Sequence, residues 1–158
     1  MSVPPKPPGY HSVTPYLIVD GAAAALDFYA VAFGAEELFR MPMGERIGHA
    51  EMRIGDSVVM LADEAPDMGY LAPTSRGGSS VSLMLYMPDV DGVFARALGA
   101  GATAERPVQD QFYGDRSGTL LDPFGHRWTV ATHVEDVPAA ELERRMKAWS
   151  AGGGEATG

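Results

Sequence analysis

His49 and Glu51 are the pair of residues with the clearest chemical potential in this sequence. They stand two positions apart in a run, residues 49–54, that we predict to be a strand, and alternate side chains of a strand point to the same side of a sheet. Both could reach one cavity, where the carboxylate would hold the imidazole in one tautomer as a general base, or where the two would bind polar groups of a ligand. The alternative interpretation is a solvated or hydrogen-bonded pair on a half-exposed strand.

A second group of polar and aromatic residues surrounds a loop in the last third of the chain. Asp115 and Arg116 follow Phe112 and Tyr113 there, and Gln109 precedes them. This mixture suits a loop that closes over an aromatic or polar ligand, because aromatic rings exposed at a loop tip would otherwise cost free energy. The alternative is a surface hairpin with an ordinary ion pair.

Other histidines lie nearer to structural roles. His126 follows Gly125 in a turn, where a histidine more often bonds to the backbone than catalyses. His133, Glu135 and Asp136 come after the last expected strand and before a C-terminal helix. They could support a neighbouring site or a dimer contact, although roles at a helix N-terminus explain the two acids adequately.

Nine methionines are many for a chain of 158 residues, and thioether side chains adapt to ligands of irregular shape. We favour core filling as their main role, and we expect Trp128 to lie in the core as well. Met60 and Met84 would line a cavity if the strand register is opposite to the one counted below.

Composition indicates one soluble globular domain, with 46% apolar and 21% charged residues. The net charge of −9 disfavours nucleic acid and anionic membrane as partners, because both require clustered Lys and Arg. No apolar run approaches the roughly 20 residues that cross a bilayer, and the N-terminal residues do not read as a secretory signal. We therefore expect a cytoplasmic location. Cysteine is absent, which excludes disulfides, thiolate nucleophiles and cysteine-ligated metal centres.

The elements that must position the candidate residues recur in two halves of the chain. In each half a strand leads into a helix with one apolar face, and three short strands separated by glycine-containing turns follow. Asp20 is placed near the first helix N-cap and Gly34 at its end. The first half is expected to hold a helix at 22–33 and strands up to 19 and at 36–41, 49–54 and 58–62; the second half is expected to hold a strand at 80–87, a helix at 90–98 and strands at 102–108, 117–121 and 127–132.

This recurrence predicts an internal duplication. The fold class is α+β, with two tandem βαβββ modules forming a curled mixed sheet around a central cavity, plus a short C-terminal helix with Leu142, Met146 and Trp149 on one face. The expected boundaries are a Pro-rich arm over 1–10, a domain over 11–135 with module one at 12–64, a long loop at 65–79 and module two at 80–134, the helix at 136–150 and a disordered tail at 151–158.

Several phrases in this order carry a family resemblance. TPYLIVDGAAAALDFYAVAFGAEE, GHAEMRIGDSVVMLADE and GDRSGTLLDPFGHRWTVATHVEDV resemble the PhnB-like branch of the vicinal oxygen chelate superfamily, which includes glyoxalase I, extradiol dioxygenases and bleomycin-resistance proteins. The resemblance covers roughly residues 12–134. It implies a cavity in which, in the metalloenzymes, His or Glu side chains from the first and last strands of each module hold a divalent ion.

The metal positions that this resemblance implies carry unsuitable side chains. Counting along the strands places them near Thr14, Val59, Ser82 and Thr129. A register error of one residue brings in Val13, Val58, Val81 and Trp128, which supply no ligand either. We therefore expect no metal and no cofactor.

The preferred function is a metal-independent small-molecule-binding protein of the glyoxalase/bleomycin-resistance type that holds a hydrophobic or aromatic ligand and forms a homodimer. The alternatives are a lyase, isomerase or hydrolase that uses His49 and Glu51 or a noncanonical divalent metal, and a structural or regulatory partner module. The candidate ligand-binding residues are Thr14, Tyr16, His49, Glu51, Val59, Ser82, Met84, Phe112, Tyr113, Arg116 and Thr129.

Overall fold

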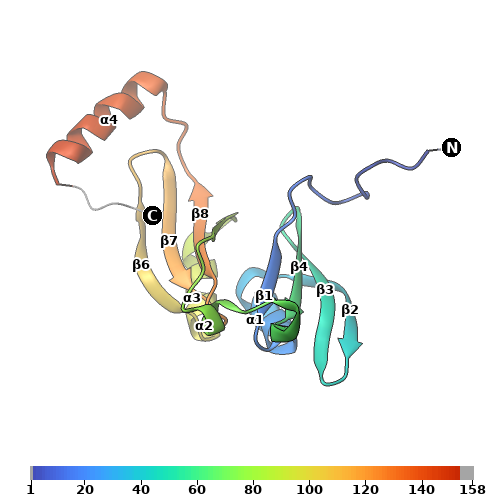
Figure 1. Ribbon diagram of the computed structural model, residues 1–158. Coiled ribbons are helices and arrows are strands. Elements are labelled where there is room, and N and C mark those ends of the chain that lie inside the picture. Colours follow the sequence, from blue (N-terminus) through green and yellow to red (C-terminus); the bar gives the residue numbers. More distant parts are fainter. Residues whose placement is uncertain (1, 154–158) are drawn as a thin grey trace.

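The computed structural model describes residues 2–153 and contains two four-stranded sheets, each with a helix packed on one face (Figure 1). The first module comprises β1 (Tyr16–Val19), α1 (Ala22–Phe33), β2 (Glu36–Met43), β3 (Arg46–Ile54) and β4 (Ser57–Asp63). The second comprises β5 (Ser82–Tyr86), α3 (Val90–Gly99), β6 (Thr103–Asp110), β7 (Asp115–Leu121) and β8 (Arg127–His133). The predicted α+β class with two βαβββ modules is confirmed.

The two sheets share one topology. The first has the strand order β1-β4-β3-β2 and the second has β5-β8-β7-β6, and in both the first strand pairs in parallel with the last. Tyr16 lies opposite Met60 in the first sheet, and Met84 lies opposite Thr129 in the second. These two pairs therefore occupy equivalent places in the two modules.

Short helical turns interrupt the segment that the sequence predicts as a long loop. A 3-10 turn η1 (Pro66–Met68) and a short helix α2 (Pro73–Arg76) both begin with proline, which suits the first helical position. The Glu64 carboxylate accepts hydrogen bonds from the Ala72 backbone N–H at 2.9 Å and from the Ser75 hydroxyl at 2.8 Å. These bonds hold the segment close to the end of β4.

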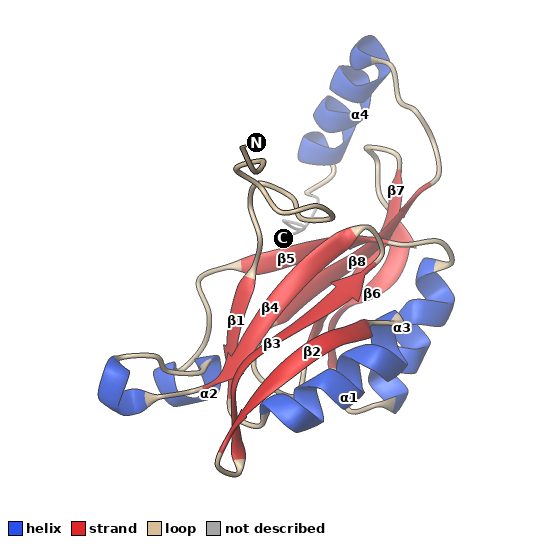
Figure 2. Cartoon of the chain, turned by 90° about the vertical axis from the view of Figure 1, so that its right-hand side faces the viewer, coloured by secondary structure: helices blue, strands red, loops and turns tan. Residues whose placement is uncertain are grey.

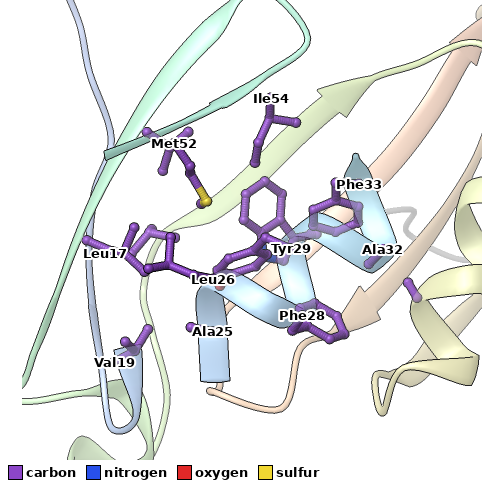
Figure 3. Close-up of a cluster of buried hydrophobic side chains, with 14 of the residues drawn as sticks. Leu17, Val19, Ala25, Leu26, Phe28, Tyr29, Ala32, Phe33, Met52 and Ile54 are labelled. Atoms are coloured by element: carbon purple, nitrogen blue, oxygen red, sulfur yellow. The ribbon is translucent and has the colours of Figure 1, made fainter. Parts of the chain in front are cut away.

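One hydrophobic core joins the modules (Figure 3). Helix α1 contributes Tyr29 and Phe33, whose rings contact Trp128 of β8 at centroid distances of 5.5 and 4.8 Å. Trp128 is only 3% exposed, as expected of a core residue. The two helices α1 and α3 also pack against each other (Figure 2), so each module covers part of the other.

The first helix begins beside Asp20 and ends at Gly34, as predicted, but a carboxylate from another strand satisfies its first backbone N–H groups. Its N-cap is Gly21, and the backbone N–H groups of Gly21 and Ala22 donate to Asp63 Oδ1 at 2.7 and 2.8 Å. Asp20 instead pairs with Arg46 at 2.8 Å. Asp20 thus lies next to the N-cap, as predicted, while a buried carboxylate from the end of β4 accepts the hydrogen bonds of the helix N-terminus.

The C-terminal helix α4 (Ala139–Ala151) projects beyond the second sheet (Figure 1). It begins three residues later than the predicted range of 136–150 and ends one residue later, so Ala151 is helical rather than part of the tail. Gly152 and Gly153 form a turn, and residues 154–158 of the predicted disordered tail lie outside the described residues. None of the described helices has the length and apolar composition that a bilayer-spanning segment needs.

Candidate functional site

The helix-free face of the first sheet carries the candidate site. Alternation along β1 and β4 buries Leu17 and Leu61 in the core and turns Tyr16 and Met60 to the other side. Val59, which the sequence count placed at the cavity, is 4% exposed and belongs to the core. The expected position of Val59 is therefore wrong, and its neighbour Met60 faces the candidate site instead. A shift of one position along a strand exchanges the two faces of the sheet to which its side chains point.

Four polar side chains form a continuous hydrogen-bonded chain on this face. Tyr10 donates through its hydroxyl to Glu51 Oε1, and His49 Nε2 lies 2.8 Å from Glu51 Oε2. The hydroxyl of Tyr16 lies 2.7 Å from His49 Nδ1. The predicted pairing of His49 with Glu51 is thus present, and a tyrosine extends it at each end.

The electrostatics fix the direction of the bonds around His49. Burial alone would raise the pKa of Glu51, but hydrogen bonds from Tyr10 and His49 outweigh it and hold that pKa below its usual value. Glu51 is therefore an ionised acceptor, so His49 Nε2 must donate to it. In the neutral imidazole Nδ1 then accepts from the Tyr16 hydroxyl.

A hollow of about 590 Å³ adjoins this chain of residues. Tyr16 and Arg46 line it together with the largely apolar side chains of Met43, Met68 and Tyr70. Its size falls within the range of small-molecule sites, and its mixture of an apolar wall with a few polar groups is typical of them. The methionines here are exposed side chains, at 65% for Met43 and 71% for Met68, rather than core filler.

A second hollow of about 720 Å³ lies beside the edge strands β1 and β5. Tyr16 contributes to its wall, as do Leu83 and His126. His126 is buried, and its Nε2 lies 3.0 Å from the backbone carbonyl oxygen of Ile18, which agrees with the expected structural role. One hollow thus lies on the helix-free face of the first sheet, and the other lies beside β1 and β5.

The second module carries a different polar cluster on its helix-free face. Tyr86 donates to Asp115 Oδ2 at 2.8 Å, and His133 bridges Asp115 Oδ1 at 2.8 Å and Asp136 Oδ1 at 2.7 Å. Two carboxylates on one imidazole favour its protonated form, and the hydrogen bond to Asp115, then that to Asp136, raises the pKa of His133. Sequence reasoning missed Tyr86, although its alternation with Ser82 and Met84 was visible.

The remaining candidates do not gather around His49. Arg116 makes ion pairs with Asp91 at 2.8 Å and with Asp110 at 3.1 Å. Phe112 packs against Tyr113 and Trp149, so this loop anchors α4. The β6–β7 hairpin that holds these residues lies across the molecule from β3 (Figure 1).

Three further candidates lie at or near the helix-free faces. Thr14 precedes β1 and donates to the backbone carbonyl oxygen of His11 at 3.0 Å. Ser82 begins β5 and is exposed, and Thr129 shares a hydrogen bond of 2.9 Å with Thr119. Within residues 2–153, no three His, Cys, Asp or Glu side chains gather in a way that could hold a metal ion.

The sequence of this chain is similar to those of known proteins. Residues 9–130 match the sequence model of the Glyoxalase/Bleomycin resistance protein/Dioxygenase superfamily. The uncharacterized protein Mb0911c of Mycobacterium bovis is 44% identical over 139 residues, which cover 85% of this chain and 91% of that protein. Its match indicates common ancestry over most of both chains.

Solved structures share the fold. TioX from Micromonospora sp. ML1 is 26% identical, with a TM-score of 0.62 over 81% of this chain and 100% of that chain. The PhnB protein from Bacillus cereus is 19% identical and has a TM-score of 0.60 over 77% of this chain and 99% of that chain. The second similarity concerns the fold alone.

Proposed function

Because the chain belongs to the Glyoxalase/Bleomycin resistance protein/Dioxygenase superfamily, we propose that it binds a small hydrophobic or aromatic molecule on the helix-free face of its first sheet, without a metal ion. The observation that carries the proposal is the hollow of about 590 Å³, in which exposed methionine and tyrosine side chains stand beside the Tyr16–His49–Glu51 chain. The exposure of apolar side chains of this kind costs free energy in water, and a bound ligand would remove that cost.

The donor chemistry supports a site that works without metal. The facing positions at the first and last strands of the modules are Tyr16 with Met60 and Met84 with Thr129. A phenol, two thioethers and a hydroxyl lack the charge and donor strength that Zn²⁺, Ni²⁺, Fe²⁺ or Mn²⁺ sites need. The superfamily's metal therefore does not fit these residues.

A second copy of the chain is part of the proposal. The helix-free faces leave large apolar side chains open, with Tyr16 and Met84 each 47% exposed and Met41 57% exposed. Apposition of the first sheet of one copy to the second sheet of another would cover both faces. Light scattering should give twice the chain mass of 16.8 kDa, and Met84→Glu should shift the protein toward the monomer. A monomeric wild type would contradict the dimer. We also propose a cytoplasmic location, with which a chain that carries no cysteine is compatible.

Ligand binding can be tested by NMR of ¹³C-labelled methionine methyl groups during a screen of aromatic compounds. We expect ligands to shift the signals of Met43 and Met68, and to leave that of Met146 on α4 unchanged. His49→Ala and Glu51→Ala should each weaken binding while the far-UV circular dichroism stays unchanged. Unchanged affinity in both variants would remove these residues from the site.

Metal independence is tested separately by calorimetry of metal-stripped protein with Ni²⁺, Zn²⁺, Mn²⁺ and Fe²⁺. We expect no stoichiometric binding at submicromolar affinity. Such binding would contradict the metal-free site, whatever the outcome of the ligand screen.

A further inference from the structure

The C-terminal helix α4 forms one wall of a hollow that lies outside the hydrophobic core. Each residue of this helix is at least partly exposed, and the helix meets the rest of the protein at the tip of the β6–β7 hairpin. There the centroid of the Trp149 ring lies 5.5 Å from that of Phe112, and Arg145 Nη1 donates to the Phe112 carbonyl oxygen at 3.1 Å. The space beside these rings, the α4 hollow, measures about 790 Å³.

The side chains that line the α4 hollow suit an extended peptide rich in proline. Trp149, Phe112 and Pro107 supply flat apolar surface, and Gln109 and Gln111 supply amide N–H donors. A polyproline II segment makes no internal hydrogen bonds, so its carbonyl groups are free to accept from such donors. Grooves lined by aromatic rings bind proline-rich segments in several classes of recognition domain.

The N-terminal arm of this chain has the matching chemistry. Residues 3–10 read VPPKPPGY, and their four prolines fix φ near −65° and favour polyproline II. Residues 2–9 are all exposed, and Val3 is 87% exposed. Because such a segment is largely preformed, it loses less conformational entropy on binding than an ordinary flexible arm would.

The arm of one copy can reach the α4 hollow of another. Tyr10 anchors the arm to Glu51 of the first module, whereas the hollow belongs to the second. The arm and α4 project beyond the same end of the two sheets, and the arm runs away from α4 of its own chain (Figure 1, Figure 2). Residues 2–7 lead into the turn that Tyr10 N–H closes on the Pro7 carbonyl oxygen, and they span about 19 Å as polyproline II. Apposition of the first sheet to the second sheet of a partner would therefore bring the arm beside the partner's helix.

Charge also favours this pairing. Lys6 carries the one formal charge among residues 2–10, in a chain whose net charge is −9. The α4 hollow is lined by the carboxylates of Glu105 and Asp110 and by the guanidinium of Arg106. Two negative groups against one positive group leave the hollow attractive to a basic arm, and such complementarity contributes to the choice of partner surface.

We propose that the α4 hollow binds the proline-rich arm of a second copy of the chain, with residues 3–8 lying across Phe112 and Trp149. In a twofold symmetric dimer the exchange is reciprocal, because each copy offers one arm and one hollow. The inference rests on the dimer of the proposed function and does not require a ligand on the first sheet.

The absence of cysteine and the presence of only two tryptophans make a direct test possible. Ser2→Cys provides a single site for a nitroxide spin label. The labelled chain, at natural isotope abundance, is unfolded in urea and refolded together with unlabelled ¹⁵N-enriched chain, so that mixed dimers form. NMR then observes only the ¹⁵N-enriched copy, and broadening of its signals reports a contact between copies.

The two indole N–H groups serve as reporter and internal control. Trp149 lines the α4 hollow, whereas Trp128 lies in the core and donates to Asp122 Oδ2 at 2.9 Å. We expect the Trp149 indole signal to lose most of its intensity, relative to the same sample after reduction of the nitroxide. The Trp128 signal should keep its intensity.

Variants of the labelled chain test the chemistry of recognition. A double variant, Pro4→Gly with Pro7→Gly, frees the backbone of the arm and should abolish the broadening of Trp149. Lys6→Glu should reduce the broadening, whereas Lys6→Arg, the matched control, keeps the charge and should leave it unchanged. All of these positions are exposed in the arm, so the fold should be retained.

The outcomes separate arm exchange from dimer formation. A dimer in light scattering without selective broadening of Trp149, or broadening that persists in the double proline variant, would overturn arm exchange and leave the dimer intact. A monomer in light scattering would overturn both proposals, and binding of small molecules on the first sheet would be unaffected.

Discussion

The hydroxyl of Tyr29 in the first module donates a hydrogen bond of 2.5 Å to Asp122 Oδ2 in the second, 93 residues further along the chain. The same oxygen accepts from Trp128 Nε1 at 2.9 Å, and Oδ1 accepts from the backbone N–H groups of Phe124 and His126, each at 2.9 Å. The phrase DPFGHRW, on which much of the family resemblance rests, is thus organised around a buried carboxylate that ties the two modules together.

Removal of one hydroxyl tests this connection. Tyr29→Phe keeps the ring packing and deletes only the bond to Asp122, so we expect the free energy of unfolding to fall by about 1.5–3 kcal/mol, the usual value for a hydrogen bond to a charged group. Urea denaturation measures it. Tyr70→Phe, at an exposed tyrosine, should change stability by less than about 0.5 kcal/mol, and equal losses in the two variants would contradict the assignment.

The order of elements could be predicted from the sequence because its signals are local. The helix at 22–33 was predicted with the observed bounds, since apolar residues repeat on one face and Gly34 ends the helix in the left-handed conformation. Glycine-containing turns likewise marked the hairpins of each module. What the sequence left open was the side of the sheet to which a strand residue points.

The residues of the candidate site could be predicted only in part, because their prediction requires the side of the sheet to which each residue points and the contacts between distant segments. Counting from Gly55 turned Val59 outward instead of Met60, because one residue of error exchanges the faces of a strand. Tyr10 reaches Glu51 from an arm 41 residues away, and no local pattern in a proline-rich segment announces such a contact. The pairing of His49 with Glu51 was predictable, since alternation in one strand sufficed.

Gly118 of β7 marks a close approach of two side chains. A Cβ atom there would lie 2.9 Å from Phe94 Cε2 and 2.9 Å from Val108 Cγ2. Gly118→Ala should therefore overpack the second module and cost about 1–3 kcal/mol of unfolding free energy, measured by chemical denaturation. Gly99→Ala is the matched control, because no atom lies within 4 Å of its added Cβ; we expect a gain of about 0.4–1 kcal/mol there. A neutral Gly118→Ala would show that the contact is not tight.

His133 should make the stability of the folded protein fall as the pH rises above neutrality. Its pKa is raised in the folded protein by Asp115 and then Asp136, so its contribution is complete below the unfolded-state pKa of about 6.5 and is lost as the pH rises through the higher folded-state pKa. His133→Gln should therefore lower the melting temperature more at a pH of about 5.5 than at a pH of about 9. An equal effect at both pH values would exclude the charged bridge.

Among the carboxylates of the first module, Asp63 should contribute most to the free energy of unfolding. Its two oxygens accept from the backbone N–H groups of Gly21, Ala22 and Ile47 at 2.7–2.8 Å, and from Arg46 at 2.9 Å. Asp63→Ala leaves the buried N–H groups of Ala22 and Ile47 unpaired, so we expect a loss of about 3 kcal/mol in urea denaturation. Asp20→Ala, which removes only the exposed partner of Arg46, should cost less than about 1 kcal/mol.

The pH dependence of the same residue has the opposite sign to that of His133. Burial would raise the pKa of Asp63, but the backbone bonds from Ile47, Ala22 and Gly21 outweigh it and lower that pKa. Its contribution is therefore complete above the unfolded-state pKa of about 3.9 and is lost as the pH falls through the lower folded-state pKa. The stability difference between wild type and Asp63→Ala should shrink as the pH is lowered from about 6 toward 3. A difference that stayed constant over this range would mean that the neutral side chain serves the helix N-terminus equally well, and that its charge contributes nothing.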